Sequence, residues 1–156
     1  MHTAQQVQRC GSFELPRSAE LAFPLFSPEG ERGWIKTWNP RPLFPASIVF
    51  ARDTVFREGN GSEEAVWTIV DVDWKTHRAE YVRVALASHA AHIVVKLDSI
   101  PANRSRVTVT YTVTAFGDRA DTLLEAFSES AYASKMQNWQ RQISAHLEAC
   151  PTREVG

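Results

Sequence analysis

The chain has 156 residues, a length that suits a single domain over residues 1–156 with a substantial buried core. Its net charge of -1, with both signs interspersed, gives no basic surface to attract nucleic acid or an anionic membrane. Residues 1–9 lack an apolar signal segment, and no run reaches the about 20 apolar residues that span a bilayer, so we expect a cytoplasmic protein without integral membrane contact.

One strand and a first short helix are predicted before residue 27. The strand covers residues 7–15 and ends at Pro16, because proline cannot continue a β-ladder. Ser18 is a suitable N-cap for the helix that follows, and Pro24 keeps this helix short.

A second short helix is predicted over residues 27–39. Its first residues read Ser-Pro-Glu, in which serine caps the helix, proline suits the first helical position and glutamate faces the positive helix end. Asn39 and Pro40 end the helix. Residues 41–45 then form an extended connection into the sheet.

Three charged residues, Glu29, Glu31 and Arg32, stand close together in this second helix. The favoured interpretation is that they interact with the helix end and form a local ion pair. The alternative is that Glu31 or Arg32 acts as a gate at the mouth of a binding cavity.

From Ala46 onward the pattern has period two and predicts antiparallel strands joined by short turns. The strands are placed at residues 47–52, 54–58, 64–73, 79–86, 91–99 and 105–116. In the last of them Val107, Val109, Tyr111 and Val113 alternate with threonines, as in a sheet with one solvated face. Tyr111 is therefore expected to face inward.

The strand at residues 79–86 has two alternative orientations. Apolarity favours its valines and Leu86 facing inward, which leaves Tyr81 and Arg83 in solvent. A register shifted by one residue turns Tyr81 and Arg83 inward instead. In that case Arg83, near Asp71, would recognise a carboxylate or an enolate on a ligand.

Helical periodicity over residues 120–149 predicts one long C-terminal helix that lies across the sheet. Its apolar stripe consists of Leu124, Phe127, Ala131, Met136, Trp139, Ile143 and Leu147. Its solvated side carries Glu125, Glu129, Lys135, Gln137 and Arg141.

Motifs that carry catalysis or hold a cofactor are absent from the sequence. There is no Gly-x-Ser-x-Gly elbow, Walker loop or dinucleotide fingerprint. His89 and His92 have a spacing that places them on opposite faces of a strand, which argues against a metal site. Cys10 and Cys150 stand near opposite ends of the chain and are expected to be reduced. We therefore expect no metal and no cofactor, and catalytic residues stay unassigned.

Several segments carry a resemblance to a known family. They are residues 23–34, which read Phe-Pro-Leu-Phe-Ser-Pro-Glu-Gly-Glu-Arg-Gly-Trp, then Trp38-Asn39-Pro40, and residues 64–67, 81–84 and 107–112. Together with the order of elements, they resemble the SRPBCC superfamily of START-like and Bet v 1-like proteins, which includes small bacterial polyketide cyclase/dehydrase relatives. The resemblance implies the α+β helix-grip fold: a curved antiparallel sheet of six to seven strands around a long C-terminal helix, with two short helices after the first strand.

The resemblance also implies a cavity between sheet and helix that binds a small hydrophobic or aromatic molecule, such as a lipid or a polyketide-like metabolite. The expected lining is Trp34, Trp38, Trp67, Tyr81, Arg83, Tyr111, Phe127, Met136 and Trp139. The same aromatic residues would also serve to fill an ordinary core.

Two alternative functions stay open beside simple binding. The first is a cavity enzyme of the polyketide cyclase/dehydratase type, in which Tyr81, Tyr111 and Arg83 polarise a carbonyl group. The second is a protein-interaction module like the co-chaperone relatives of the same superfamily. Whether the protein is an enzyme is not decided by the sequence, and it is expected to be a monomer or a homodimer.

Overall fold

The structure is a computed structural model that describes residues 4–149. Its strands are β1 (Gln5–Leu15), β2 (Arg41–Phe44), β3 (Val55–Glu58), β4 (Ala65–Asp73), β5 (Arg78–Ala85), β6 (His89–Ile100) and β7 (Arg104–Ala115). Its helices are α1 (Ala19–Ala22), α2 (Pro28–Glu31), α3 (Ala120–Glu125) and α4 (Glu129–Ala149), with 3-10 turns η1 (Phe23–Phe26) and η2 (Gly61–Glu63).

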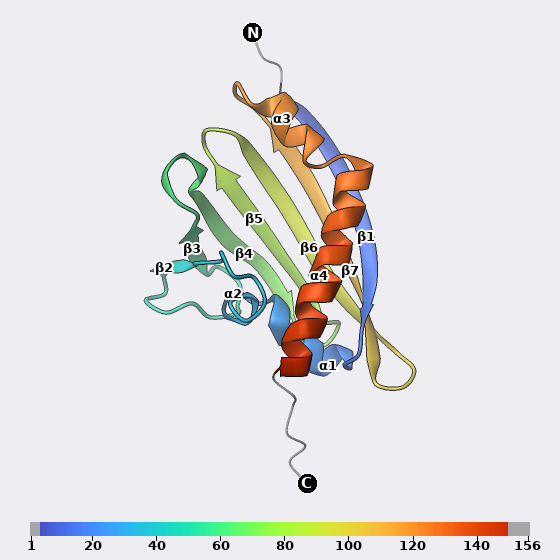
Figure 1. The fold of residues 1–156 in the computed structure, drawn as a ribbon. Coiled ribbons are helices and arrows are strands. Elements are labelled where there is room, and N and C mark those ends of the chain that lie inside the picture. The colour runs from blue at the N-terminus through green and yellow to red at the C-terminus, as the bar shows by residue number, and fades with distance from the viewer. Residues whose placement is uncertain (1–3, 150–156) are drawn as a thin grey trace.

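The strands form one antiparallel seven-stranded sheet in the order β1-β7-β6-β5-β4-β3-β2. Helix α4 lies across one face of this sheet (Figure 1). Helices α1 and α2 lie near the C-terminal end of α4, and α3 lies near the opposite end of the sheet. This arrangement confirms the predicted helix-grip architecture. No helix among residues 4–149 is long and apolar enough to cross a membrane.

The face of the sheet beneath α4 forms the core. In β7 the side chains of Val107, Val109, Tyr111 and Val113 are all buried, while the threonines between them are partly exposed. This alternation confirms that Tyr111 faces inward. The long β6–β7 and β1–β7 pairings hold that face in register over their whole length.

The predicted strand at residues 47–52 is wrong, because these residues form the loop between β2 and β3. The short strand β2 lies instead at residues 41–44, which were predicted as an extended connection. The alternation that suggested a strand has another cause: Ile48 and Phe50 pack singly against the core without a partner strand, and the Phe50 ring lies 5.2 Å from that of Phe23.

The single C-terminal helix predicted over residues 120–149 is also wrong, because the chain breaks between α3 and α4. Ser128 starts the second helix: its Oγ accepts a hydrogen bond from the Ala131 N–H at 3.2 Å, and its carbonyl accepts from the Tyr132 N–H at 2.9 Å. Glu129 then occupies the first turn, where its charge faces the positive helix end. A capping serine and a following glutamate were the signal for this break.

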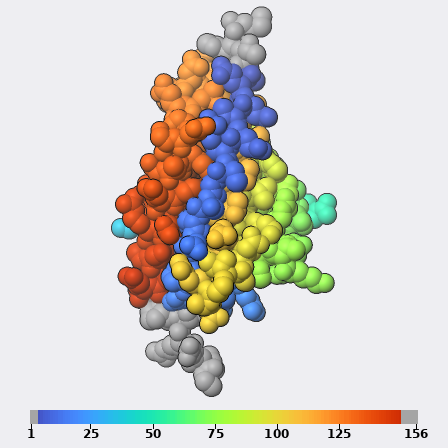
Figure 2. Space-filling model, turned by 90° about the vertical axis from the view of Figure 1, so that its right-hand side faces the viewer, coloured from blue at the N-terminus to red at the C-terminus, as the bar shows by residue number. Residues whose placement is uncertain are grey.

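Strand β1 and helix α4 lie side by side along one side of the molecule (Figure 2). Gly11 permits this contact, because a Cβ at that position would lie 2.8 Å from Cγ of Met136 and 3.1 Å from Cε1 of Tyr132. Cys10, the neighbour of Gly11, is an exposed free thiol, as predicted. Cys150 lies outside the described residues.

Candidate functional site

An internal cavity of about 240 Å³ lies between the sheet and α4. It is walled by aromatic side chains, namely Trp38, Phe56, Trp67, Tyr81, Tyr111 and Trp139. Four ionisable side chains also line it, namely Glu31, Glu58, Arg83 and Lys135. These residues come from the α2 segment, from β3, β4, β5 and β7, and from α4, so the complete fold is needed to assemble the site.

Trp38, Trp67, Tyr81, Arg83, Tyr111 and Trp139 were all predicted to line a cavity, and the structure places them in this wall. It places the remaining predicted residues, Trp34, Phe127 and Met136, outside it. Trp34 packs behind Trp139 at 5.3 Å, Phe127 packs against Tyr111 at 5.6 Å, and Met136 turns toward β1.

The orientation of β5 is the opposite of the favoured prediction. Tyr81 is 4% exposed and Leu86 is 88% exposed, so the valine face points outward. The regular pairing with β6 sets this face, because Tyr81 lies opposite Ile93, which is also buried. Strand β4 contains an irregularity, where Ile69 lies opposite Tyr81 but Asp71 lies opposite Glu80. The extra residue between them keeps Trp67 and Ile69 facing inward on the same side as Tyr81.

The proposed pairing of Arg83 with Asp71 is wrong because of this irregularity in β4. Asp71 is exposed beyond the irregularity in β4, whereas Arg83 lies opposite Trp67. The guanidinium carbon of Arg83 lies 5.2 Å from the centre of the Trp67 ring, a cation–π contact. The acidic side chains that share the cavity with Arg83 are Glu31 and Glu58.

The aromatic wall is held by contacts between its own members. The Trp67 ring stacks on Phe56 at 5.7 Å and meets Trp38 edge-on at 5.3 Å. Trp38 is fixed in turn, because its Nε1–H donates to the Pro28 carbonyl at 2.8 Å. Nε1 of Trp67 is buried and has no hydrogen-bond partner among residues 4–149, which makes it a donor available to a ligand.

The two cavity tyrosines differ in how their hydroxyl groups are used. The Tyr81 hydroxyl donates to the Phe26 carbonyl at 2.7 Å and so fixes η1 to the sheet. The Tyr111 hydroxyl makes no hydrogen bond to the described part of the chain, so it can serve a ligand. Burial raises the pKa of Tyr111 to about 12, and that of Tyr81 well above its ordinary value, so both phenols keep their protons at neutral pH.

Tyr81→Phe is expected to lower the free energy of unfolding by about 1–3 kcal/mol, because it leaves the buried Phe26 carbonyl without its donor. Tyr111→Phe is the matched control and is expected to change stability by less than about 0.5 kcal/mol. Urea denaturation of both variants measures the difference. Equal effects of the two substitutions would contradict this assignment of the hydroxyl groups.

Two cations face the cavity, Arg83 on β5 and Lys135 on α4. The Nζ atom of Lys135 lies 4.3 Å from the centre of the Tyr111 ring and 5.1 Å from that of Phe127. Neither cation forms an ion pair within residues 4–149. Burial, reinforced by the charge of Arg83, lowers the pKa of Lys135 to about 8.

Lys135 was predicted on the solvated side of the C-terminal helix, and that prediction is wrong. The signal for its true position is its spacing, since Ala131, Lys135 and Trp139 are four residues apart and share one helix face. A charged residue within an apolar stripe was assigned to solvent by residue type, although its position belonged to the buried face.

Glu31 also lies in the cavity wall. Its burial raises the pKa of its carboxyl group well above the ordinary value, the Glu58 carboxylate adds to this rise, and Lys135 opposes it. The favoured interpretation of the charged cluster holds for its other members, because Arg32 pairs with Glu29 at 3.1 Å. Glu31 is thus a carboxyl group that favours its neutral form beside two cations.

An adjoining pocket of about 600 Å³ shares Glu58 and Arg83 with the internal cavity and extends to α3. His89 lies in its wall, with Nδ1 2.7 Å from the Ser88 Oγ. Burial lowers the pKa of His89 to about 4, so its ring is neutral at pH 7. His92 points the other way and meets the Glu80 carboxylate at 2.7 Å, which confirms that the two histidines lie on opposite faces.

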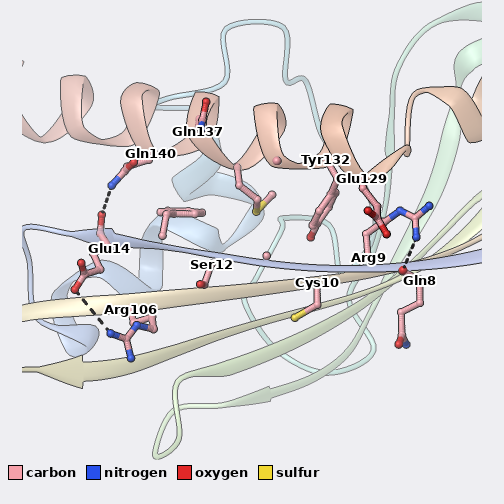
Figure 3. Close-up of a pocket in the computed structure, with 14 residues that line it drawn as sticks. Gln8, Arg9, Cys10, Ser12, Glu14, Arg106, Glu129, Tyr132, Gln137 and Gln140 are labelled. Carbon is pink, nitrogen blue, oxygen red and sulfur yellow. Dashed lines mark hydrogen bonds and ion pairs between the residues drawn. The ribbon is translucent and has the colours of Figure 1, made fainter.

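A third hollow, larger than the two pockets above, is an outer groove of about 770 Å³ between β1 and α4 (Figure 3). Within it the Gln140 side chain donates to the Glu14 carbonyl at 3.1 Å, and Arg9 donates to the Gln8 carbonyl at 3.2 Å. These contacts satisfy carbonyl groups of the edge strand and supply no converging reactive groups. We therefore take the internal cavity as the candidate site.

Neither the protein-family models nor the curated proteins give a match to this sequence. Solved structures do match over nearly the whole chain. Ara h 8.0201 has a TM-score of 0.66 at 12% identity, over 93% of this chain and 99% of its own. A protein from Rhizobium leguminosarum has a TM-score of 0.68 at 13% identity, over 94% of this chain and 97% of its own.

A third match is norcoclaurine synthase from Thalictrum flavum, solved in complex with dopamine and hydroxybenzaldehyde. Its TM-score is 0.67 at 8% identity, over 96% of this chain and 91% of its own. Identities this low establish the fold alone. The chain therefore has the helix-grip fold of Bet v 1-like proteins.

Proposed function

We propose that the protein binds a small aromatic molecule with an acidic group in the internal cavity. The observation that carries this proposal is the pair of cations, Arg83 and Lys135, set into an aromatic wall without ion-pair partners within residues 4–149. A partly buried cation without an ion-pair partner is costly, and an anionic ligand would offset that cost. The negative charge of such a ligand would balance the positive charges of Arg83 and Lys135.

The charge balance of the cavity favours an anion over a cation. Arg83 is always charged, while burial raises the pKa of the Glu31 carboxyl group and so disfavours its negative charge. The planar guanidinium of Arg83 matches a carboxylate or an enolate, because it can donate two parallel hydrogen bonds. Its Nε is buried and has no partner in the described part of the chain.

The volume of the internal cavity limits the size of the ligand. Benzene fits a cavity of about 150 Å³, so about 240 Å³ suits one substituted ring or two fused rings. Edges of Trp38, Trp67 and Trp139 would pack against such rings, and apolar burial contributes about 25 cal/mol per Å². A long lipid chain would need the adjoining pocket as well.

Neighbours of the same fold support a cavity with an aromatic occupant. Norcoclaurine synthase was solved with two small aromatic molecules, dopamine and hydroxybenzaldehyde. A cavity lined by several polar groups also favours ligand binding over the protein-interaction alternative, which needs no such cavity.

The first test compares two probes of one shape, 4-hydroxybenzoate and 4-hydroxybenzamide, by isothermal titration calorimetry. The carboxylate is expected to bind about 10–100 times more tightly, the factor given by one charge-assisted hydrogen-bonded contact. Arg83→Gln should remove most of that preference while leaving the affinity for the amide nearly unchanged.

Arg57→Gln is the matched control, because Arg57 is exposed on β3 and pairs with Glu64 at 3.9 Å, away from the cavity. It should leave both affinities as they are. An affinity for 4-hydroxybenzoate that is the same in wild type and Arg83→Gln would remove Arg83 from the proposal. Failure of both probes to bind would overturn the aromatic-acid function itself.

A further inference from the structure

The amine of Lys135 lies among aromatic side chains. Three aromatic rings surround its Nζ atom, Tyr111 at 4.3 Å, Phe127 at 5.1 Å and Trp139 at 5.6 Å. No carboxylate forms an ion pair with it among residues 4–149. The amine is thus partly buried among aromatic rings in the cavity wall, where its uncharged form is favoured.

Groups that can exchange a proton line the same cavity. They are the Glu31 carboxyl on α2, the Glu58 carboxylate on β3 and the Tyr111 hydroxyl on β7. Arg83 on β5 adds a fixed positive charge that opposes protonation of the lysine. The amine of Lys135, the carboxyl group of Glu31, whose pKa is raised by burial, and the guanidinium of Arg83 therefore line one space of about 240 Å³.

We propose that Lys135 captures a small aromatic aldehyde or ketone as a covalent imine inside the internal cavity, with Glu31 exchanging the protons of this step. The inference rests on the proposed function, because the carbonyl compound must first bind in the cavity. It adds a reaction to that function and names the substrate class as a carbonyl compound.

The step balances without an oxidant or a reductant. The lone pair of Lys135 Nζ forms a C–N bond to the carbonyl carbon as the C=O π bond breaks, and the carbonyl oxygen becomes a hydroxyl group by taking one of the two protons of that nitrogen. The Glu31 carboxyl group protonates that hydroxyl, which leaves as water, and the resulting carboxylate takes the proton that nitrogen loses. Lysine and carbonyl compound thus become imine and one water molecule.

The lowered pKa of Lys135 supports this assignment. With a pKa of about 8, roughly a tenth of the amine is neutral at pH 7, about 300-fold more than for an exposed lysine. The gain is partly offset because a less basic amine is a weaker nucleophile. We expect Lys135 to form the imine about tenfold faster than any exposed lysine.

The test treats the whole protein with 4-carboxybenzaldehyde and sodium cyanoborohydride at pH 7, which reduces an imine to a stable secondary amine. Mass spectrometry of the intact protein counts the adducts, and peptide mapping locates them. One adduct at Lys135 is expected at short times. Lys135→Met should abolish it, and Lys36→Met, which changes an exposed lysine, should leave it in place.

A second ligand separates failure of the inference from failure of the proposed function. 4-Methylbenzoate keeps the ring and the carboxylate but has no carbonyl group able to form an imine. If it binds and displaces the aldehyde while no adduct forms at Lys135, the imine proposal is overturned and the binding function stands. If neither compound binds, the binding function is overturned as well. Labelling spread evenly over exposed lysines also overturns the imine proposal.

Discussion

Gly30→Ala is expected to lower the free energy of unfolding by about 3 kcal/mol or more, a large loss for a substitution of one hydrogen by a methyl group. A Cβ at Gly30 would lie 2.0 Å from the carbonyl oxygen of Pro24 and 2.9 Å from Cα of Leu25. Both atoms belong to the backbone of η1. They cannot rotate away, so α2 and η1 would have to separate.

Ser27 also holds α2 close to η1. Its Oγ accepts from the Gly30 N–H at 2.9 Å and donates to the Pro24 carbonyl at 2.7 Å. The serine, proline and glycine of this motif thus act together to fold the chain back on itself. Because the segment continues into Glu31 and Trp38, a displaced α2 would also open the internal cavity.

Gly33→Ala is the matched control, since a Cβ there would meet only the His146 imidazole, at 2.7 Å. That ring lies at the end of a side chain and can rotate. The change is expected to stay within about 1 kcal/mol of wild type. Urea denaturation measures the free energy of unfolding of both variants. A Gly30→Ala protein as stable as Gly33→Ala would contradict the prediction, because it would show that η1 can move away from α2 without loss of stability.

The fold was predictable from the sequence because its signals are local. Alternating valines and threonines identify β7, and the Ser-Pro-Glu triplet identifies the start of α2. The predictions were wrong where a single inserted residue changes which side chains face the core. The irregularity after Ile69 changes the face to which β4 directs its side chains, so that Asp71 is exposed, and nothing in the sequence near it marks an extra residue.

The candidate site was less predictable, because it is defined by positions rather than by residue types. The aromatic residues were recognised from their bulk, and Trp38, Trp67, Tyr81, Tyr111 and Trp139 lie in the wall. Lys135 was missed as a cavity residue, and Glu31 was placed at the cavity only in the alternative of a gate at its mouth, since charged residues on short or amphipathic helices are normally solvated. Only the packing of α2 and α4 against the sheet encloses them.

Lys135→Met is expected to raise the free energy of unfolding at pH 7, by up to about 3 kcal/mol. The fall in the lysine pKa from 10.5 to about 8 is the measure of what the buried ammonium costs the folded protein. Methionine has a similar length and keeps the apolar contacts with Tyr111 and Trp139. Lys36→Met, on the exposed surface, should change stability by less than about 0.5 kcal/mol.

The stability gain from Lys135→Met is expected to depend on pH. Between pH 8 and pH 10.5 the unfolded chain holds a proton on Lys135 that the folded protein has released, so the stability of the wild type rises with pH relative to the variant. The gain from Lys135→Met is therefore full below pH 8 and fades toward pH 10.5. Glu31 and the buried tyrosines titrate in both proteins, so the difference between the two unfolding curves removes most of their contribution. If the stability gain from Lys135→Met stays constant over this pH range, Lys135 is as well hydrated in the folded protein as in the unfolded chain. Its pKa would then be that of an ordinary lysine, which would contradict its assignment as the nucleophile.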